Sequence, residues 1–338
     1  MTLDAIDDAY ARLATTGPEF DGWLSNHGPM AAEALARHDT DVDLSSWLDR
    51  YTRRLEPTPG PSARIDDWAA ALGDPRRLGD WLGWFEEEAA TRPWTDVLGA
   101  WWPRLVPGIA AGATHGVIRV GHAVRVLREL GETPERVAEL GRGLAYWSAR
   151  WQPVPGATGP RGRLDAATAI SALPAITPQT GGIQKRLRRL AVLDGWAAAQ
   201  SAIAPSADAE QFLRDLVIAA VRRYATHAHG NPVMLVHAAT APNAVLRTLP
   251  SLAPGLWAGS VEAAWSASAA IVAAYAPSSG RQVPPWRSEP AVLFDRAAHH
   301  GDEHVIKLAD TALDAYAWSG DVDTLRAVET AIALIDPL

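Results

Sequence analysis

The 338-residue chain is 48% hydrophobic and 21% charged, which is the composition of an ordinary globular protein and excludes extensive disorder. Its formal net charge of -8 argues against sequence-independent binding to nucleic acid or to an anionic membrane, because both need a concentrated positive face. The chain has no cysteine, so disulfides, thiolate nucleophiles and cysteine-ligated metal clusters are excluded. Any metal must therefore be bound through nitrogen and oxygen.

The spacing of apolar residues is helical along the whole chain, and no alternating strand series is present. Asn231-Pro232 and Thr133-Pro134 predict helix starts, whereas Pro103, Pro107 and Pro242 predict kinks or breaks. We expect an all-α, single multi-helix domain over residues 1–338 with a buried histidine-rich core site and a sub-boundary near 153–162. The predicted helices are 31–37, 44–55, 78–90, 97–111, 114–130, 135–151, 186–202, 209–227, 232–249, 261–275, 304–318 and 322–335.

The amino-terminal residues, Met1-Thr-Leu-Asp-Ala-Ile-Asp-Asp8, are acidic where a secretory signal would be basic and then apolar. The most apolar run, 263–275, has about 13 residues, whereas a spanning helix needs about 20. We therefore expect a cytoplasmic protein without a membrane partner. The sequence leaves the oligomeric state open.

Histidines on apolar helices are the main functional signal. His115 and His122 lie seven residues apart, and at about 100° per residue this step returns to within roughly 20° of the same helix face. His27 precedes Gly28-Pro29 at a helix entrance, and His237 and His304 also lie in or beside apolar segments. A buried imidazole must be satisfied by a ligand or by a hydrogen bond. A metal site and a set of ordinary core histidines are both compatible with this pattern.

Five short motifs together resemble the questin oxidase family, and the resemblance covers most of the chain. It implies dioxygen-dependent, Baeyer-Villiger-like opening of an aromatic polyketide ring such as an anthraquinone, by a monooxygenase or dioxygenase, with NADPH dependence. The short chain, rich in alanine and arginine, leaves the identity of the small aromatic substrate open. The motifs are Asn26-His-Gly-Pro-Met30, His115-Gly-Val-Ile-Arg-Val-Gly-His-Ala-Val-Arg125, Leu144-Ala-Tyr-Trp-Ser-Ala-Arg150, Val233-Met-Leu-Val-His237 and Gly301-Asp-Glu-His-Val-Ile-Lys307.

Iron is the cofactor that the residues favour. Dioxygen chemistry needs a flavin, a nicotinamide-fed cofactor or a redox metal, and no strand followed by G-x-G-x-x-G is present. The nearest match, Gly141-Arg-Gly143, lies in a helical segment with Tyr146 where the third glycine belongs. Imidazole suits ferrous iron, so we assign a non-haem iron to His27, His115, His237 and His304. His122 is assigned to acid-base catalysis or substrate contact, although His115 and His122 can exchange these roles.

Lys307 follows His304 by three residues and shares its helix face. A lysine buried beside a metal carries an expensive charge, and its neutral amine can react with CO₂ to give a carbamate. Such a carbamate would be an anionic fifth ligand. The alternative is a surface lysine paired with Glu303 or Asp310.

Two other functions remain open. One is a non-catalytic all-α module that binds an aromatic ligand, with its histidines as a polar core network. The other is a zinc hydrolase using His300-Gly-Asp-Glu-His304, which matches H-x-x-E-H; however, Gly301-Asp302 predicts a helix start between the two histidines.

Aromatic and small residues suggest close packing around the same segments. Most of the 15 tryptophans should be core bulk, although Trp101-Trp102 and Trp147 with Trp151 can also wall an aromatic pocket. Gly108, Gly112 and Gly116 recur every four residues, a spacing that favours the close approach of two helices.

Overall fold

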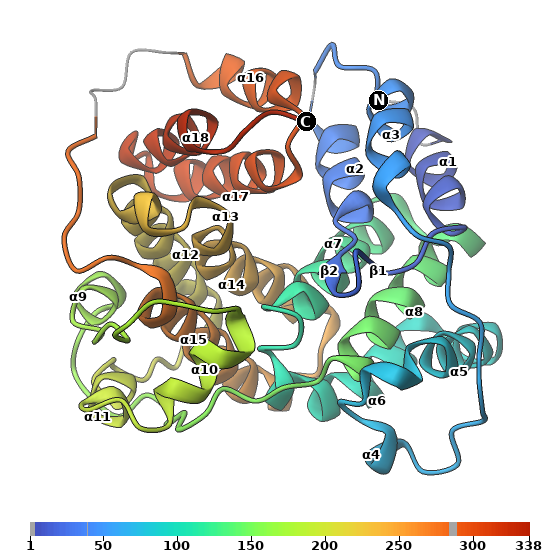
Figure 1. Ribbon diagram of the computed structural model, residues 1–338, viewed down its shortest axis with the longest axis horizontal. Helices are drawn as coiled ribbons and strands as arrows, with labels where there is room; N and C mark the ends of the chain where they lie inside the picture. Colours follow the sequence, from blue (N-terminus) through green and yellow to red (C-terminus); the bar gives the residue numbers. More distant parts are fainter. Residues whose placement is uncertain (1–3, 39, 284–288) are drawn as a thin grey trace. The chain divides into compact units, whose positions relative to one another are not determined.

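The computed structural model describes residues 4–38, 40–283 and 289–338, and it confirms the all-α class (Figure 1). Within these residues the only sheet is a two-stranded antiparallel one, β1 (Glu19–Phe20) with β2 (Leu24–Ser25). The chain divides into two compact units. Unit 1 comprises the described residues up to Pro153, together with 247–256 and Leu338, and unit 2 comprises 154–246 and the described part of 257–337.

Unit 1 is built around α8, which packs against α5 and α7, while α2 packs against α7 and α1. The two histidines of the first long motif both lie on α7. Short 3-10 helices follow α3, precede α5, and follow α6. The α-helices are α1 (Asp4–Leu13), α2 (Gly28–Arg37), α3 (Leu44–Tyr51), α4 (Trp68–Ala71), α5 (Leu78–Thr91), α6 (Trp94–Leu105), α7 (His115–Leu130) and α8 (Pro134–Ala149), and the 3-10 helices are Thr52–Arg54, Pro75–Arg77, Val106–Gly108, Leu249–Ser251 and Pro254–Leu256.

Unit 2 is built around α12, which packs against α9, α15, α17 and α18. Its α17 and α18 also pack against each other. The α-helices are α9 (Ala166–Ser171), α10 (Ile183–Leu190), α11 (Trp196–Ser201), α12 (Ala209–His227), α13 (Pro232–Leu235), α14 (His237–Thr248, of which the last two residues belong to unit 1), α15 (Trp257–Tyr275), α16 (Leu293–His300), α17 (Glu303–Ser319) and α18 (Asp323–Leu334), and the 3-10 helices are Ala228–Gly230 and Pro290–Val292.

A left-handed run of backbone sets the start of α7. Gly112, Ala113 and Thr114 have φ values of 51°, 58° and 73°. The left-handed conformation costs a residue with a side chain roughly 1–2 kcal/mol, so Ala113 and Thr114 are strained. Strain of this kind persists only where the surrounding structure enforces it, and it directly precedes His115.

The three regularly spaced glycines make room for aromatic side chains, which confirms the packing interpretation. A Cβ atom on Gly108 would lie 2.2 Å from Trp151, one on Gly112 would lie 2.3 Å from the Tyr146 hydroxyl, and one on Gly116 would lie 2.6 Å from Trp147. Each distance is far below a normal contact. A side chain at any of these positions would displace a large ring.

Most predicted helices are present, and the starts at Thr133-Pro134 and Asn231-Pro232 are confirmed by side-chain caps to the amides of Arg136 and Met234. The single helix predicted over 186–202 is wrong. It is split into α10 and α11, because α10 ends at Leu190 and a turn over 191–195, which closes with Gly195 at a φ of 77°, precedes α11. A kink or break was predicted at Pro242; α14 runs through Pro242 without a break, and the predicted helix is interrupted at Val236 instead.

The backbone carbonyl that Pro242 leaves without a helical donor accepts a hydrogen bond from a side chain instead. A proline removes the bond to the carbonyl four residues earlier, here Ala238. The Ser268 hydroxyl donates to that carbonyl at 2.8 Å. Pro103 likewise lies inside α6, which ends two residues later at Leu105 before the 3-10 helix that contains Pro107. Among the described residues, none of the helices has both the length and the apolar character needed to cross a membrane.

Candidate metal centre

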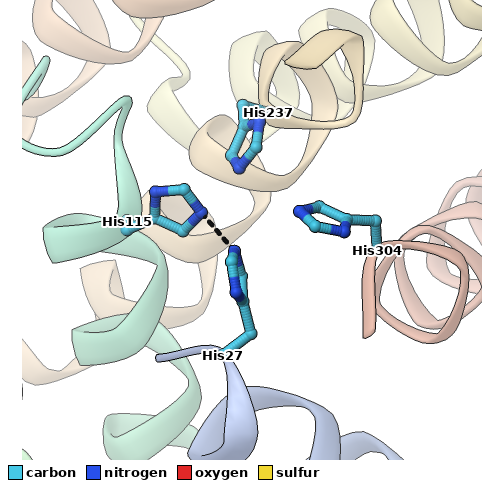
Figure 2. Close-up of side chains that lie close together, drawn as sticks. All are labelled: His27, His115, His237 and His304. Carbon is cyan, nitrogen blue, oxygen red and sulfur yellow. Dashed lines mark hydrogen bonds between the residues drawn. The ribbon is translucent and has the colours of Figure 1, made fainter. Parts of the chain in front are cut away.

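Unit 1 brings His27 and His115 together. His27 immediately precedes α2 and His115 begins α7, and their Nε2 atoms lie 2.6 Å apart with the rings edge to face (Figure 2). The Nδ1 atom of His115 donates to the carbonyl of Gly112, so its Nε2 atom carries a lone pair. In the hydrogen bond between the imidazoles, His27 Nε2 is therefore the donor. The backbone amide of His27 donates a hydrogen bond to the Tyr51 hydroxyl at 2.7 Å.

This geometry is close to that of two ligands on one metal ion. Two imidazole nitrogens at ~2.1 Å from a tetrahedral ion lie about 3.4 Å apart. The pair has to open by less than ~1 Å, and the proton between the two nitrogens has to leave, for an ion to take its place. His27 and His115 can thus supply two nitrogen ligands.

Unit 2 brings His237 and His304 near each other. His237 begins α14 and His304 lies in the first turn of α17, with ring centroids 5.9 Å apart (Figure 2). The Nδ1 atom of His237 donates to the carbonyl of Met234 at 3.0 Å, which leaves a lone pair on Nε2. The Nδ1 atom of His304 lies 3.3 Å from an oxygen of Asp302. An oxygen acceptor at Nδ1 is the usual way in which proteins orient a metal-ligating imidazole.

Carboxylates accompany His304. Potential ligand atoms of Asp302, Glu303 and His304 all lie within 4.8 Å of one another. Asp302 also caps α17, accepting from the amides of His304 and Val305. Burial raises the pKa of Asp302, but the contacts with His304 and the amide donors outweigh it, so the pKa is lowered overall. Asp302 is thus held as an anion beside the imidazole.

Lys307 is buried on α17, which corrects the surface-lysine alternative. Its side chain is 0% exposed, and among the described residues Nζ has no hydrogen-bond partner. Burial lowers the pKa of Lys307 to about 8, although Glu303 and Asp302 oppose this shift. A substantial fraction of neutral amine is therefore accessible at mildly alkaline pH.

His122 lies on the same helix as His115 but has different partners. Its Nδ1 atom donates to Glu33 at 2.7 Å, and Arg125 binds both oxygens of that carboxylate. A guanidinium nitrogen of Arg247 lies 3.5 Å from the Nε2 atom of His122. The proton on Nδ1 leaves Nε2 as an acceptor. The result is a buried imidazole whose orientation is fixed by a carboxylate, as in many catalytic acid-base pairs.

The pKa of His122 makes folding stability depend on pH. Burial lowers it to about 4; Glu33 raises it, while Arg247 and Arg125 lower it further. In the unfolded chain His122 has a pKa near 6.5. Between about pH 6.5 and pH 4 its imidazole is therefore protonated in the unfolded chain and neutral in the folded chain. Stability is fully present above this window and is lost as the pH falls through it. From pH 7 to pH 5 the loss due to His122 is about 2 kcal/mol.

The measurement is urea unfolding at pH 7 and pH 5 for the wild type and for His122→Gln. The variant should lose about 2 kcal/mol less than the wild type over this interval. Comparing the two removes the contribution of His227, whose pKa burial also lowers to about 4. Equal losses in the two proteins would show that His122 titrates normally.

Sequence reasoning missed Glu33, Arg125 and Arg247. The signal for Glu33 and Arg125 was available, because each is a single charged residue within an apolar helical stretch, Met30-Ala-Ala-Glu-Ala-Leu-Ala36 and Val120-Gly-His-Ala-Val-Arg-Val126. Both are buried. A lone charge on an apolar helix almost always has a partner, since an unpaired buried charge is too costly. No such signal marks Arg247.

The H-x-x-E-H interpretation requires two histidines on one helix, and this requirement is not met. His300 ends α16 and His304 belongs to α17, with Gly301 at a φ of 82° between them. The Nε2 atom of His300 instead contacts the carbonyl of Ile335 at 3.0 Å. The helix start predicted at Gly301-Asp302 is confirmed.

Both units thus contain buried donors of the kind that hold a metal ion. Unit 1 contributes two nitrogens, from His27 and His115, and unit 2 contributes His237 and the Asp302, Glu303 and His304 group. Compared with known proteins, the chain is matched by no family model, no curated protein and no solved structure.

Proposed function

We propose that the protein is a dioxygen-using oxidoreductase with one non-haem ferrous ion bound by His27, His115, His237 and His304. The observation that carries this proposal is the oxygen that lies beside Nδ1 in three of the four imidazoles. In His115 and His237 a backbone carbonyl accepts from Nδ1, and in His304 a carboxylate faces it, so that Nε2 is left for a metal. Nitrogen donors of this kind suit ferrous iron, which when bound supplies the redox chemistry that dioxygen requires.

The proposed substrate is an anthraquinone-like aromatic polyketide that undergoes oxidative, Baeyer-Villiger-like ring cleavage. The resemblance of the five motifs to the questin oxidase family supports this reaction class. NADPH is proposed as the electron donor. The role of NADPH is tested by measuring the NADPH consumed per molecule of ring-opened product. Turnover with dioxygen in the complete absence of NADPH would show that NADPH is not the electron donor.

Metal analysis is the decisive experiment for the function. We expect about one iron per chain after anaerobic reconstitution with ferrous salt, removal of excess metal and elemental analysis. Zinc reconstitution under identical conditions serves as the comparison, because zinc occupies nitrogen sites without supplying redox chemistry. A protein that remains metal-free but binds a hydroxyanthraquinone would instead be the non-catalytic binding module.

Lys307 is proposed as the fifth donor in the form of a carbamate. The neutral amine nitrogen attacks the carbon of CO₂, a nitrogen-carbon bond forms, and one proton leaves to give a carbamate anion. The support is the complete burial of Lys307 and the lack of a hydrogen-bond partner for Nζ among the described residues. Carbamylation replaces this costly cation with an oxygen ligand.

Removing CO₂ should lower both the iron content and the activity, and bicarbonate should restore them. Lys307→Ala should lose iron and recover part of it with a short carboxylic acid that fills the vacant ligand position. Lys185→Ala, on the solvated face of α10, is the control and should respond to neither treatment. Intact-mass analysis that finds an unmodified Lys307 in the active, iron-loaded protein would refute the carbamate.

His122 is proposed to contact the substrate and to accept a proton or hydrogen bond from one of its hydroxyl groups through Nε2. Its support is the Glu33 contact, which fixes the proton on Nδ1. His122→Ala should keep its iron and lose turnover with a hydroxyanthraquinone by a factor on the order of 10²–10⁴. Loss of iron in this variant would instead make His122 a metal ligand.

A further inference from the structure

A series of tryptophan rings in unit 1 begins beside His115. Trp147 on α8 packs against the backbone of Gly116, the residue after His115, where a Cβ atom would lie 2.6 Å from its ring. Trp147 meets Trp102 on α6 edge to face, with ring centroids 5.4 Å apart. Both indoles are fully buried. The first two rings of the series are therefore in contact and shielded from water.

The series continues through Trp101, which is joined to Trp102 by the backbone. Ring centroids of Trp101 lie 5.5 Å from Trp81 and 5.9 Å from Trp84 on α5, and Trp81 and Trp84 are themselves 6.1 Å apart. Trp81 is buried, whereas Trp84 is only half-buried. The series thus leads from the neighbourhood of His115 to the surface of unit 1.

The Arg104 guanidinium affects where in this series a positively charged, oxidised ring is favourable. The Arg104 guanidinium lies over the rings of Trp68 and Trp101, at 4.7 and 4.8 Å from their centroids. A cation at this distance disfavours a second positive charge on either ring. Glu86 and Glu87 follow Trp84 on α5, and the next residue, Glu88, pairs with Arg92. The Arg104 cation therefore makes an oxidised indole less favourable at Trp101 and Trp68 than at Trp84.

The composition leaves indoles as the main oxidisable groups. The chain has no cysteine and three methionines, so it has few of the sulfur atoms that usually absorb oxidants. A hydrophobic core can be filled by any large side chain. It does not require easily oxidised rings in two contacting groups, joined through consecutive residues Trp101 and Trp102, between the residue after His115 and a half-buried ring.

We propose that Trp147, Trp102, Trp101, Trp81 and Trp84 form a relay that carries oxidising equivalents away from His115 when peroxide meets the iron without organic substrate. This proposal rests on the proposed function. Reduction of hydrogen peroxide to two molecules of water takes two electrons and two protons; solvent would supply the protons, a bound ferrous ion would supply one electron and Trp147 the other. Each later step moves one electron from the next indole toward Trp147. A soluble reductant such as ascorbate finally returns one electron at Trp84.

The indole proton stays in place during these steps. Nε1 of Trp147 donates to the carbonyl of Gly108 at 3.1 Å, and Nε1 of Trp81 donates to the carbonyl of Ala71 at 3.3 Å. A backbone carbonyl is an acceptor but not a base at neutral pH, so these rings keep their protons when oxidised. The positive charge is then passed on rather than trapped as a neutral radical.

The test mixes iron-loaded protein with one equivalent of hydrogen peroxide under anaerobic conditions without substrate. Freeze-quenched samples are examined by electron paramagnetic resonance, and oxidised residues are mapped by peptide mass spectrometry. In the wild type we expect an indole radical that ascorbate removes, with little oxidation of His115. In Trp102→Phe, oxidation of Trp147 and His115 should rise severalfold and oxidation of Trp84 should fall.

Two further variants keep the test decisive. Trp265→Phe, a fully buried indole of unit 2, is the matched control and should behave as the wild type. Trp84→Phe changes only a half-buried ring, and it should prolong the radical signal and weaken its response to ascorbate even if Trp102→Phe folds poorly. Absence of an indole radical in iron-loaded wild type, or equal His115 oxidation in all variants, overturns the relay. A wild type that binds no iron overturns the proposed function and the relay with it.

Discussion

Replacing His237 by alanine is expected to reduce iron from near stoichiometric to background and to abolish turnover. Its side chain is fully buried, and its Nδ1 atom is held by the Met234 carbonyl, so Nε2 is the nitrogen left for a metal. A metal that binds only the folded chain also stabilises it, so iron should raise the melting temperature of the wild type and not that of the variant. Elemental analysis and thermal unfolding with and without ferrous iron measure both effects.

His299→Ala is the matched control. His299 lies on α16 of the same unit with a side chain that is 55% exposed, and its Nδ1 atom contacts the Asp295 backbone. It should keep both iron content and activity. If His237→Ala and His304→Ala bind as much iron as this control, the histidine assignment is wrong and the buried imidazoles are structural.

Replacing Glu33 by glutamine is expected to destabilise unit 1 by about 3–5 kcal/mol. The carboxylate binds the Arg125 guanidinium through both oxygens and also accepts from His122, and all three side chains are buried. Glutamine has nearly the same shape, but it removes the negative charge that the buried guanidinium contacts through two hydrogen bonds. Urea unfolding at pH 7 measures the loss.

Glu129→Gln provides a control of the same chemical change. Glu129 pairs with Arg37 at the surface of unit 1, where the two side chains are 47% and 35% exposed. Exposed pairs contribute about 0–1 kcal/mol, so this variant should be nearly as stable as the wild type. Adding Arg125→Met to Glu33→Gln should restore much of the loss, because it removes the buried positive charge that Glu33 balanced. Equal effects of the two glutamine variants would mean that the buried pair contributes no more than a surface one.

The helices could be predicted from the sequence because their causes are local. Periodic apolar residues and the caps at Thr133 and Asn231 act within a few residues of the helix that they define. The split between α10 and α11 was missed because the turn over 191–195, which ends with Gly195, interrupts an otherwise helical pattern. A short turn of this kind depends on the backbone conformation of a few residues and leaves no periodic signal.

The candidate site was predictable in its residue types and not in its contacts. His115 and His122 share a helix face, but seven residues separate them by about 10 Å along the axis, and they have different partners. The pairing of His122 with Glu33 joins positions 89 residues apart. Sequence spacing on one helix contains no information about which side chain a second helix presents. That Lys307 is buried likewise follows from packing around α17 rather than from its immediate sequence.

The left-handed turn before α7 would affect how fast the protein binds and releases the proposed metal ion. The carbonyl that closes on His115 Nδ1 belongs to Gly112, the first residue of that turn, so the ring is already oriented when the turn has formed. A free imidazole would lose rotational entropy on binding a metal. In this chain that loss has therefore already occurred during folding. Once the proton shared with His27 has left, an imidazole held in this way would bind the proposed ion without reorienting, and it could swing aside only after residues 112–114 had opened locally.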